Sequence, residues 1–530
     1  MAHPKKIVIL GGGIGGLTVA HFLSKFPEYD ISIYEAKSTI GGLARSGRDQ
    51  NGCATEYCWR VIFGFYDGLM GILNEIPTSS KTTAIDNLTV YKHVNVMDPL
   101  STKDMIAGYS SIFAGLGACD ERLDELDNQS WWEALHTASD SNLFREIGGW
   151  LGMDRYRGSY KSVIKIGIEQ QIVPSYLSNT YKDYVTTKPT SEAIFEPWQN
   201  LLESRGVKVY TDSPVTNIEI RSDRVVYAKV GKEHVEADYF IFNLPVEVLE
   251  PLLRNANIDS TKFAISNLTR LKEECLHTQL SFQLYFNRPV SLGGNNAFLL
   301  VESPWDLIVL SYDAIYQTQL CKDLPGVKGG WSVAACTAYI PGIVYGKTMA
   351  ECTEEEINTE LWAQLSSSKR LQNLITANNP FGLTKDIVVG WAEMWPTYDK
   401  KGSKEYGKSP ALRTSEPKFT NNAGSYALRP SFRMYLKNAF ISTAYIKETI
   451  DIFSMEAAVI AGKRVANAID FRSPSPTIRD RPEMFRVLRN IDGVLYSLGL
   501  PNVIVVVSIF VLIILVMAIV STRPKNDKYK

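Results

Sequence analysis

The chain has 530 residues, of which 45% are hydrophobic and 21% are charged, and its formal net charge is −1. This composition is typical of a globular protein with a large core, and the length allows about two to four domains of roughly 150 residues. The balanced charge and the lack of a basic block exclude a protein that binds nucleic acid through general electrostatic attraction.

Seven cysteines are scattered along the chain, and no two of them have C-x-x-C spacing. An odd number of cysteines at irregular spacing predicts neither a disulfide framework nor a zinc site, and it favours a reducing compartment. The six histidines are also isolated from one another. The sequence therefore predicts no metal site.

The first predicted elements form a β–turn–α–turn–β unit within about 30 residues. Apolar runs at 7–10 and 31–34 predict two strands, and the apolar residues of 14–26 have helical spacing. Such a unit at the start of a domain is typical of proteins that bind a dinucleotide.

The turn between the first strand and the helix reads GGGIGG and contains G-x-G-x-x-G as Gly11, Gly13 and Gly16. Gly11 permits a tight turn, Gly13 lets the backbone approach a pyrophosphate, and Gly16 lets the helix pack closely on the strand. The free N–H groups at the start of the helix stabilise the pyrophosphate. Glu35 ends the second strand, where a carboxylate accepts hydrogen bonds from ribose hydroxyls and disfavours NADP.

The later elements alternate between helical and strand-rich stretches. Helices are predicted at 62–75, through most of 100–170, and at 193–205, 353–365 and 455–469; strands are predicted at 207–242, 277–340, 386–396 and 440–443. This order predicts a nucleotide-binding domain that is interrupted by insertions. We assign 1–75, 190–260 and 420–470 to the cofactor domain, and 76–189 and 261–419 to a substrate domain with a helical cap and a sheet.

The C-terminal part has a different composition. Residues 471–502 predict a linker with an amphipathic helix, and 503–520 is an apolar run in which only Ser508 is polar. As a helix this run is roughly 27 Å long, which is about the thickness of the hydrocarbon layer of a bilayer. The sequence therefore predicts a single-pass C-terminal anchor at 503–520, with the main part of the chain facing the cytosol because no signal peptide precedes it.

After Glu35 the chain continues AKSTIGGLARS, in which Gly41-Gly42 is followed by Arg45. This segment resembles the second signature of the amine oxidase and phytoene desaturase superfamily of flavoproteins, where it surrounds the FAD pyrophosphate. Paired glycines permit close backbone approach, and a guanidinium pairs with phosphate oxygens. The resemblance implies that the dinucleotide is FAD.

Further segments resemble the same superfamily and follow in the same order, closest to its phytoene desaturase-like and hydroxysqualene dehydroxylase-like members. They are residues 55–69, SPWD at 303–306, residues 342–365, GSYALRP at 424–430, and SMEAAVIAGKRVANAI at 454–469. The resemblance implies an α/β plus α+β fold: a Rossmann-like FAD-binding domain of the glutathione reductase type, interrupted by a mixed substrate domain.

The turn and the resemblance together define the predicted site. Cofactor contacts are predicted at Gly11, Gly13, Ile14, Gly15, Gly16, Glu35, Ala36, Gly42, Leu43, Arg45, Val215 and Met455. Arg60, Tyr66 and Tyr445 are the candidates for residues that line the flavin. The sequence departs from the family at Thr443-Ala444, which stand where the family has Gly-Asp.

Three functions follow as hypotheses. The resemblance implies an FAD-dependent, desaturase-like oxidoreductase that acts at a membrane on a large apolar substrate such as an isoprenoid. The second hypothesis is a flavin amine oxidase, for which Tyr445 and Trp391 are available as aromatic residues. The third is a non-enzymatic membrane protein that retains a degenerate FAD fold, and Thr443-Ala444 favours it.

Overall fold

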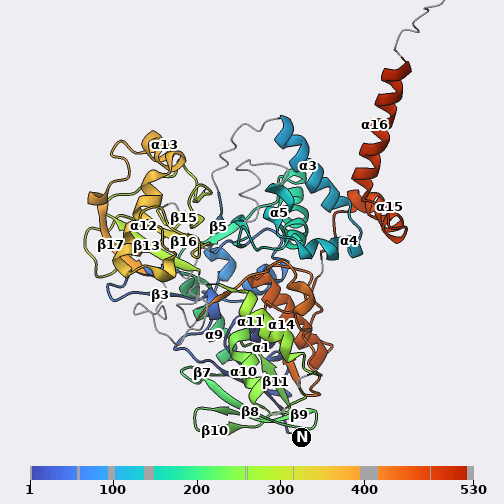
Figure 1. Ribbon diagram of the computed structural model, residues 1–530. Coiled ribbons are helices and arrows are strands. Elements are labelled where there is room, and N and C mark those ends of the chain that lie inside the picture. Colours follow the sequence, from blue (N-terminus) through green and yellow to red (C-terminus); the bar gives the residue numbers. More distant parts are fainter. Residues whose placement is uncertain are drawn as a thin grey trace, which may run out of the picture.

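The computed structural model describes residues 3–56, 60–92, 102–136, 149–256, 258–259, 261–277, 279–313, 315–393, 416–477 and 479–521. Three regions are visible in Figure 1: a parallel sheet with its helices at the bottom, an antiparallel sheet at the upper left, and a group of helices at the upper right. The last helix projects from this third region.

A five-stranded parallel sheet forms the first region, with strand order β19-β11-β1-β2-β7. The strands are β1 (Lys5–Leu10), β2 (Tyr29–Tyr34), β7 (Lys208–Tyr210), β11 (Tyr239–Phe242) and β19 (Ala439–Ile441). In the central strand, Ile7 pairs with Ile31 on one side and with Tyr239 on the other. All five strands fall within the three segments assigned to the cofactor domain, so distant parts of the chain build one sheet.

Helices α1 (Ile14–Leu23) and α14 (Met455–Ile469) pack against each other beside this sheet. A Cβ atom on Gly462 would lie 2.5 Å from the carbonyl oxygen of Gly15 and 2.6 Å from the Cβ of Thr18. The two helices therefore lie so close together that only glycine fits at position 462. The predicted helix at 14–26 ends earlier, at Leu23, whereas 455–469 agrees with α14.

The opposite face of the parallel sheet is covered by a smaller antiparallel sheet and two helices, which share one hydrophobic core with it. These elements are β8 (Val215–Arg221), β9 (Arg224–Val230), β10 (Glu233–Val235), α10 (Val246–Asn255) and α11 (Ile265–Glu274). The centre of the sheet is therefore buried on both faces, which explains why β11 and β19 and most of β1 read as continuous apolar runs.

The second region is a five-stranded antiparallel sheet with the order β14-β15-β16-β13-β17. Its strands are β13 (Leu280–Phe286), β14 (Ala297–Leu300), β15 (Leu307–Ser311), β16 (Gly329–Ala335) and β17 (Val388–Glu393). One face packs on α12 (Glu354–Ser367) and α13 (Lys369–Asn378) around Trp305 and Trp331, which are fully buried.

The third region is mainly helical. It contains α3 (Thr102–Gly117), α4 (Asp120–Glu125), α5 (Trp131–His136), α7 (Tyr160–Ser162), the π-helix η4 (Val163–Ile172) and α8 (Val173–Leu177). Helices α2 (Asp67–Leu73) and α9 (Glu196–Ser204), with the π-turn η5 (Ser191–Phe195), join it to the parallel sheet. The predicted helix at 62–75 begins only at Asp67, since Tyr66 has φ −81° and ψ 55°, outside the helical range.

Short strands and 3-10 turns complete the chain. The strands are β3 (Ser46–Arg48), β4 (Ala54–Glu56), β5 (Leu88–Val90), β6 (Tyr184–Thr186), β12 (Leu276–His277) and β18 (Lys418–Phe419). The 3-10 turns are η1 (Gly42–Ala44), η2 (Ala84–Asn87), η3 (Leu126–Asn128), η6 (Met349–Glu351), η7 (Lys385–Ile387), η8 (Tyr426–Leu428) and η9 (Glu483–Phe485).

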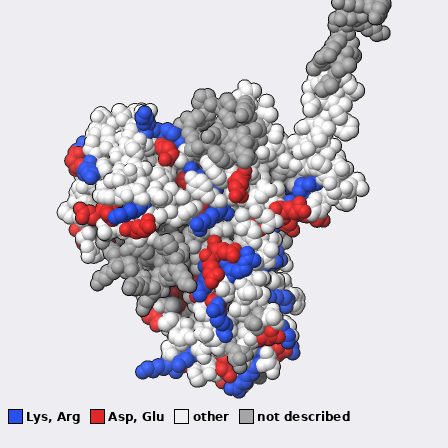
Figure 2. All heavy atoms as spheres, in the orientation of Figure 1, with Lys and Arg blue, Asp and Glu red and all other residues white. Residues whose placement is uncertain are grey.

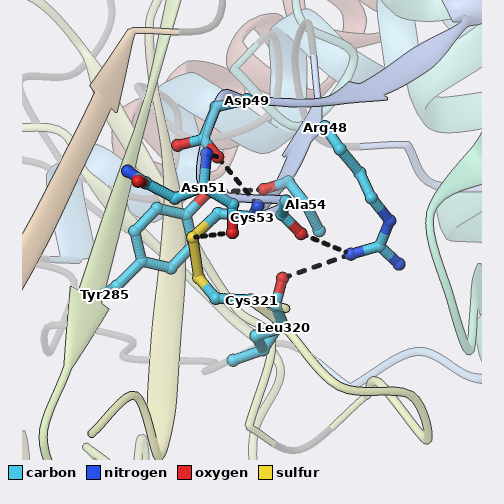
Figure 3. Close-up of a disulfide and its surroundings, with 9 residues drawn as sticks. Arg48, Asp49, Asn51, Cys53, Ala54, Tyr285, Leu320 and Cys321 are labelled. Carbon is cyan, nitrogen blue, oxygen red and sulfur yellow. Dashed lines mark hydrogen bonds between the residues drawn. A yellow bond between two sulfur atoms is a disulfide. The ribbon is translucent and has the colours of Figure 1, made fainter. Parts of the chain in front are cut away.

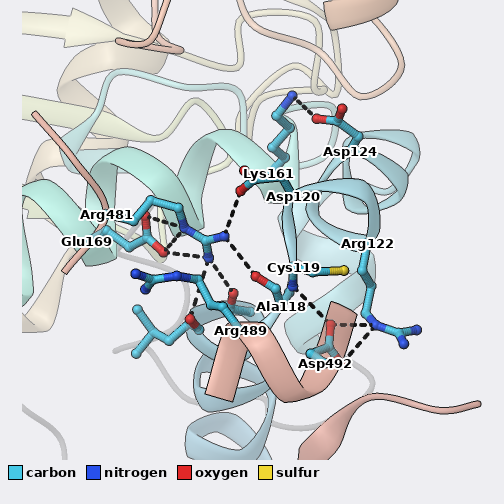
Figure 4. A network of polar contacts seen from close by, with 12 residues as sticks. Ala118, Cys119, Asp120, Arg122, Asp124, Lys161, Glu169, Arg481, Arg489 and Asp492 are labelled. Atoms are coloured by element: carbon cyan, nitrogen blue, oxygen red, sulfur yellow. Dashed lines mark hydrogen bonds and ion pairs between the residues drawn. The ribbon is translucent and has the colours of Figure 1, made fainter. Parts of the chain in front are cut away.

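The segment predicted as a linker with an amphipathic helix contains α15 (Arg486–Ser497), which is fixed to the helical region. The carboxylate of Asp492 is fully buried and accepts hydrogen bonds from the backbone N–H groups of Cys119 (2.9 Å) and Val503 (3.2 Å) and from Arg122 Nε (2.9 Å). Nearby, the Arg481 guanidinium donates to Glu169 and to carbonyl groups at the end of α3 (Figure 4). Residues 479–497 are therefore an integral part of the fold.

Helix α16 (Val503–Ser521) follows, and the side chains of 516 and 518–521 lie outside the described residues. The sequence predicts a membrane-spanning helix at 503–520. Within the described part of the chain, no helix has both the length and the apolar character needed to cross a bilayer.

The cysteine pattern predicts no disulfide framework, yet Cys53 and Cys321 form a disulfide (Figure 3). The two residues are separated by 268 positions, so their spacing carries no local signal. The bond joins the β3–β4 hairpin to the segment before β16, and Tyr285 packs beside it and donates a hydrogen bond to the Ala54 carbonyl (2.6 Å). The disulfide does not support the reducing compartment that the cysteine count favours.

Candidate functional site

A cavity of about 590 Å³ lies at the carboxyl ends of β1, β2 and β11. In open α/β sheets, ligands bind in the crevice beyond these strand ends. The cavity wall comes from ten parts of the chain: residues within 11–15, 34–45, 60–66, 150–152, 214–215, 243–248, 416–419, 443–445 and 452–458, together with Leu276 and Gln279. All the predicted cofactor residues except Gly16 line it, so the structure brings them together.

The glycine-rich turn forms the floor of this cavity. Gly11 has φ +101°, a conformation that favours glycine, and it allows the turn out of β1. A Cβ on Gly15 would lie only 1.5 Å from the carbonyl oxygen of Ser442, so this position must be glycine. Gly16 does not line the cavity; its Cβ would lie 2.7 Å from Ile9 Cγ2, and its role is the predicted packing of helix on strand.

Asn243 contacts this turn, and no signal in the sequence indicates it. It follows β11, and its side-chain amide donates a hydrogen bond to the Gly11 carbonyl (3.0 Å). A Cβ on Gly13 would lie 2.9 Å from the same amide nitrogen, so the absence of a side chain at Gly13 also makes room for Asn243. The turn is therefore held by the end of a strand more than 200 residues away.

Glu35 directly follows β2, is 8% exposed, and lines the cavity. Its Oε2 accepts a hydrogen bond from the Gly12 N–H (2.6 Å) and its Oε1 accepts one from the Lys37 N–H (2.9 Å). These bonds fix the carboxylate, and each oxygen keeps a lone pair for a ribose hydroxyl. Ala36 and Val215 line the same part of the wall.

The second glycine pair bends the chain over the turn. Gly41 has φ +112° and Gly42 has φ +56°, and a Cβ on Gly42 would lie 3.2 Å from the Cα of Gly13. Arg45 then points into the cavity wall, where its guanidinium donates to the Gly42 carbonyl (3.0 Å) and to both carboxylate oxygens of Glu416 (3.0 and 2.8 Å). No spacing in the sequence indicates the partner Glu416.

The opposite wall is formed by residues 443–445, where Thr443-Ala444 stand in place of the family's Gly-Asp, and by the start of α14. Thr443, Ala444 and Tyr445 line the cavity, and the Tyr445 hydroxyl donates to the Leu244 carbonyl (3.3 Å). Ser454 caps α14 by accepting a hydrogen bond from the Ala457 N–H (3.2 Å). Met455 is the first residue of this helix, so the positive end of the helix dipole faces the cavity.

Arg60 and Tyr66, two of the three candidates for residues that line the flavin, also lie in the cavity wall. Arg60 donates a hydrogen bond to the Leu43 carbonyl, which ties residue 60 to the cofactor segment. Tyr66 is 3% exposed, and burial raises the pKa of its phenol well above the usual range. A neutral phenol and a guanidinium therefore both face the cavity. The neighbours Tyr57 and Cys58, as well as the side chain of Trp391, lie outside the described residues.

Two further polar side chains line the cavity and were not predicted. Burial, and then the nearby Glu416 carboxylate, raises the pKa of Glu247 to about 8. The Glu247 Oε2 and the Gln279 Oε1 are buried and have no hydrogen-bond partner among the described residues. Buried polar atoms of this kind are normally paired, so both are available to a ligand.

These observations fit FAD. The floor is a cradle that added Cβ atoms would fill, two helix N-termini face the cavity, and unpaired polar atoms line its wall. No group of acidic, histidine or cysteine side chains suited to a metal ion occurs in the described part of the chain.

Two family models match the chain. Residues 9–76 match an NAD(P)-binding Rossmann-like domain, and residues 192–470 match the model described as flavin containing amine oxidoreductase. The second match alone covers more than half of the chain.

The curated proteins to which the chain is similar include two 15-cis-phytoene desaturases. The one from Capsicum annuum is 21% identical over 283 residues (47% of this chain, 48% of the relative), and the one from Arabidopsis thaliana is 21% identical over 289 residues (48% and 50%). The chain thus spans about half the length of the curated relatives it matches.

Several solved structures share the fold. An oxidoreductase from Methanosarcina mazei superposes with a TM-score of 0.59 at 14% identity, covering 87% of this chain and 99% of that one. A putrescine oxidase bound to putrescine gives a TM-score of 0.58 at 14% identity, covering 88% and 99%. At these identities the likeness shows the fold alone.

Proposed function

This chain belongs to the flavin containing amine oxidoreductase family, and from that premise we propose that it is an FAD-dependent oxidoreductase acting on a large apolar substrate. The observation that carries the proposal is one cavity that joins the glycine-rich turn to an apolar chamber.

The FAD would lie along residues that already face one another. The turn at 11–15 and the Arg45 segment would hold its pyrophosphate, Glu35 its ribose, and the start of α14 at Met455 its flavin end. When bound, the flavin supplies the capacity to accept a hydride. The chain's own contribution is to orient the substrate and to surround the reacting atoms with apolar side chains.

The chamber beyond the turn supports an apolar substrate. Its described wall includes Trp150 and Leu151 from the helical region and Leu276 and Phe419 from the paired strands β12 and β18. Burial of a hydrocarbon against such a wall is favourable by about 25 cal/mol per Å². The names of the curated relatives point the same way, because phytoene is an apolar isoprenoid.

An amine oxidase is the second candidate, and one observation favours it. The centroid of the Phe419 ring lies 5.7 Å from that of Tyr445 and 5.8 Å from that of Phe453. All three residues line the cavity. Aromatic faces of this kind attract a cationic or polarised amine.

The visible spectrum of the purified protein tests the cofactor. We expect the absorption bands of oxidised flavin, either as isolated or after addition of FAD. Gly13→Val should lose them because its side chain would fill the cradle, whereas Gly71→Val should keep them, since no atom lies within 4 Å of that position. A protein that shows no flavin under either condition would favour the non-enzymatic hypothesis.

Anaerobic addition of phytoene or of putrescine distinguishes the two enzyme hypotheses. Only the compound that is a substrate reduces the flavin and bleaches its absorption: phytoene for an oxidoreductase with an apolar substrate, putrescine for an amine oxidase.

We also propose that α16 attaches the protein to a lipid bilayer, with the main part of the chain on the cytosolic side. The support is the exposure of its apolar side chains, among them Phe510 (63%) and Leu512 (61%). Figure 2 shows no charged residue on the part of this helix that is drawn in white, whereas charges of both signs are mixed over the rest of this face. Flotation with liposomes should carry the full chain but not a 1–500 variant; equal flotation of both would refute this role of α16.

A further inference from the structure

The carboxylate of Glu416 contacts two cations of the cofactor cavity, Arg45 and Lys37. It accepts hydrogen bonds from Arg45 Nη2 at 3.0 and 2.8 Å, and Lys37 Nζ lies 3.3 Å from its Oε1. The side chains of Arg45 and Glu416 are only 10% and 11% exposed. All three residues line the cavity.

Arg45 and Lys37 belong to the segment that follows β2 and turns over the glycine-rich floor. The other cations in the wall have different partners: Arg60 donates to the Leu43 carbonyl, and Lys418 Nζ donates to the Gly152 carbonyl (3.0 Å). Arg45 and Lys37, which lie beside Glu416, are therefore the cations best placed to bind a pyrophosphate.

We propose that Glu416 is an internal competitor for the cofactor pyrophosphate, and that it sets the affinity of the site. The inference rests on the proposed FAD function. A carboxylate and a phosphate group present the same type of acceptor to a guanidinium, so both cannot take the same donors of Arg45. To bind, the pyrophosphate must displace Glu416 from Arg45 and Lys37.

The electrostatics of the cavity strengthen this competition. Glu416 lies close enough to Glu247 to raise the pKa of that carboxyl, and its own carboxylate faces the region that would take the negative charges of a pyrophosphate. Like charges at low exposure repel more strongly than they would in water. The Glu416 carboxylate therefore opposes the pyrophosphate both as a rival and as a like charge.

The opposite possibility is that Glu416 holds Arg45 in place for the cofactor. The two roles predict changes of opposite sign on removing the charge, which makes the inference testable. In the competitor role Glu416→Gln tightens FAD binding; in the positioning role the same substitution weakens it.

The experiment is a titration of the full chain, freed of flavin, with FAD, followed by quenching of flavin fluorescence. We expect Glu416→Gln to lower the dissociation constant by about tenfold, the effect of removing one charge-assisted contact. Glu416→Ala is a second variant with the same expected direction. Arg45→Ala should bind more weakly, and adding Glu416→Gln to it should recover much less than tenfold, because the contested donor is gone.

The matched control is Glu192→Gln. Glu192 makes an ion pair with Arg48 at 2.7 Å on the adjoining strand, outside this cavity, and its loss should leave FAD affinity unchanged. Equal or weaker binding by both Glu416 variants, with FAD bound by the wild type, overturns the competitor role and leaves the cofactor proposal standing. Failure of every variant to bind FAD overturns the cofactor proposal and this inference with it.

Discussion

At the scale of single residues, the site depends on glycines whose neighbours are backbone atoms. Gly15 is the clearest case, because a Cβ there would lie 1.5 Å from the Ser442 carbonyl. In an ordinary helix, replacing glycine by alanine stabilises by about 1 kcal/mol. Here steric exclusion outweighs that gain, since neither the carbonyl nor α1 can move without disturbing the sheet.

We therefore expect Gly15→Ala to lower the melting temperature by several degrees and to abolish flavin binding. Gly71→Ala is the matched control on α2, where a Cβ meets nothing within 4 Å, and it should leave the melting temperature unchanged or raise it. Thermal unfolding of both variants in the same buffer makes the comparison; equal melting temperatures would contradict the close approach to Ser442.

Glu247 gives the site a pH dependence. Its pKa is about 8 in the folded protein, against 4.5 for the ordinary group. Between these values the folded protein keeps a proton that the unfolded chain has released, so stability falls as pH rises, by at most about 1.4 kcal/mol per unit. Glu247→Gln removes this loss.

The melting temperature of Glu247→Gln should rise relative to the wild type from pH 5 to pH 8. FAD affinity should also fall in the wild type above pH 8, where a new negative charge faces the pyrophosphate, and the variant should lack this fall. Glu203→Gln, at an exposed position on α9, is the control. Parallel stability curves for wild type and Glu247→Gln would count against burial of this carboxyl.

At the scale of elements, the C-terminal helices are fixed by one buried carboxylate. Asp492 joins α15 to the N–H of Cys119, to Arg122 and to the N–H of Val503 (Figure 4). Loss of a charged acceptor costs about 1.5–3 kcal/mol, and it leaves buried donors without a partner.

Asp492→Asn should therefore open α15 and α16 locally while the parallel sheet stays intact. Hydrogen exchange of amides in 486–503 should become faster, with little change in β1 or β11. Glu483→Gln removes an exposed ion pair with Arg486 from the same segment, and it should have almost no effect. Unchanged exchange in Asp492→Asn would show that hydrophobic packing alone holds α15.

The elements also show what could be predicted from sequence. The βαβ unit, the glycine turn, Glu35 and α14 were predicted because strand period, helix period and glycine spacing are local signals. Asn243, Glu247, Gln279 and Glu416 reach the cavity from later segments, and no spacing in the sequence relates them to residues 11–45. The sequence predicts too early a start for α2, because apolar spacing does not show that the backbone at Tyr66 lies outside the helical range.

At the scale of the whole molecule, the Cys53–Cys321 disulfide connects the segment after the cofactor turn to the antiparallel sheet region (Figure 3). It closes a loop of 268 positions, and a bond of this kind typically stabilises by about 2–4 kcal/mol. The stabilisation should be lost when either cysteine is replaced.

Cys53→Ser should lower the melting temperature, and a reductant should lower that of the wild type by a similar amount. The reductant should not lower the melting temperature of Cys53→Ser any further, which separates this bond from the buried thiols of Cys119, Cys275, Cys336 and Cys352. A wild type that melts at the same temperature with and without reductant would show that the bond does not contribute.

The strand order of the parallel sheet has a consequence for synthesis. β11 ends at residue 242, but its outer neighbour β19 begins only at residue 439. At roughly 5–20 residues per second, the ribosome needs about 10–40 s to deliver that neighbour. During this interval the edge of β11, with apolar Phe240, Ile241 and Phe242, has no partner strand, and such edges template aggregation. The nascent chain must therefore be protected until β19 and α14 have emerged and completed the cofactor cavity.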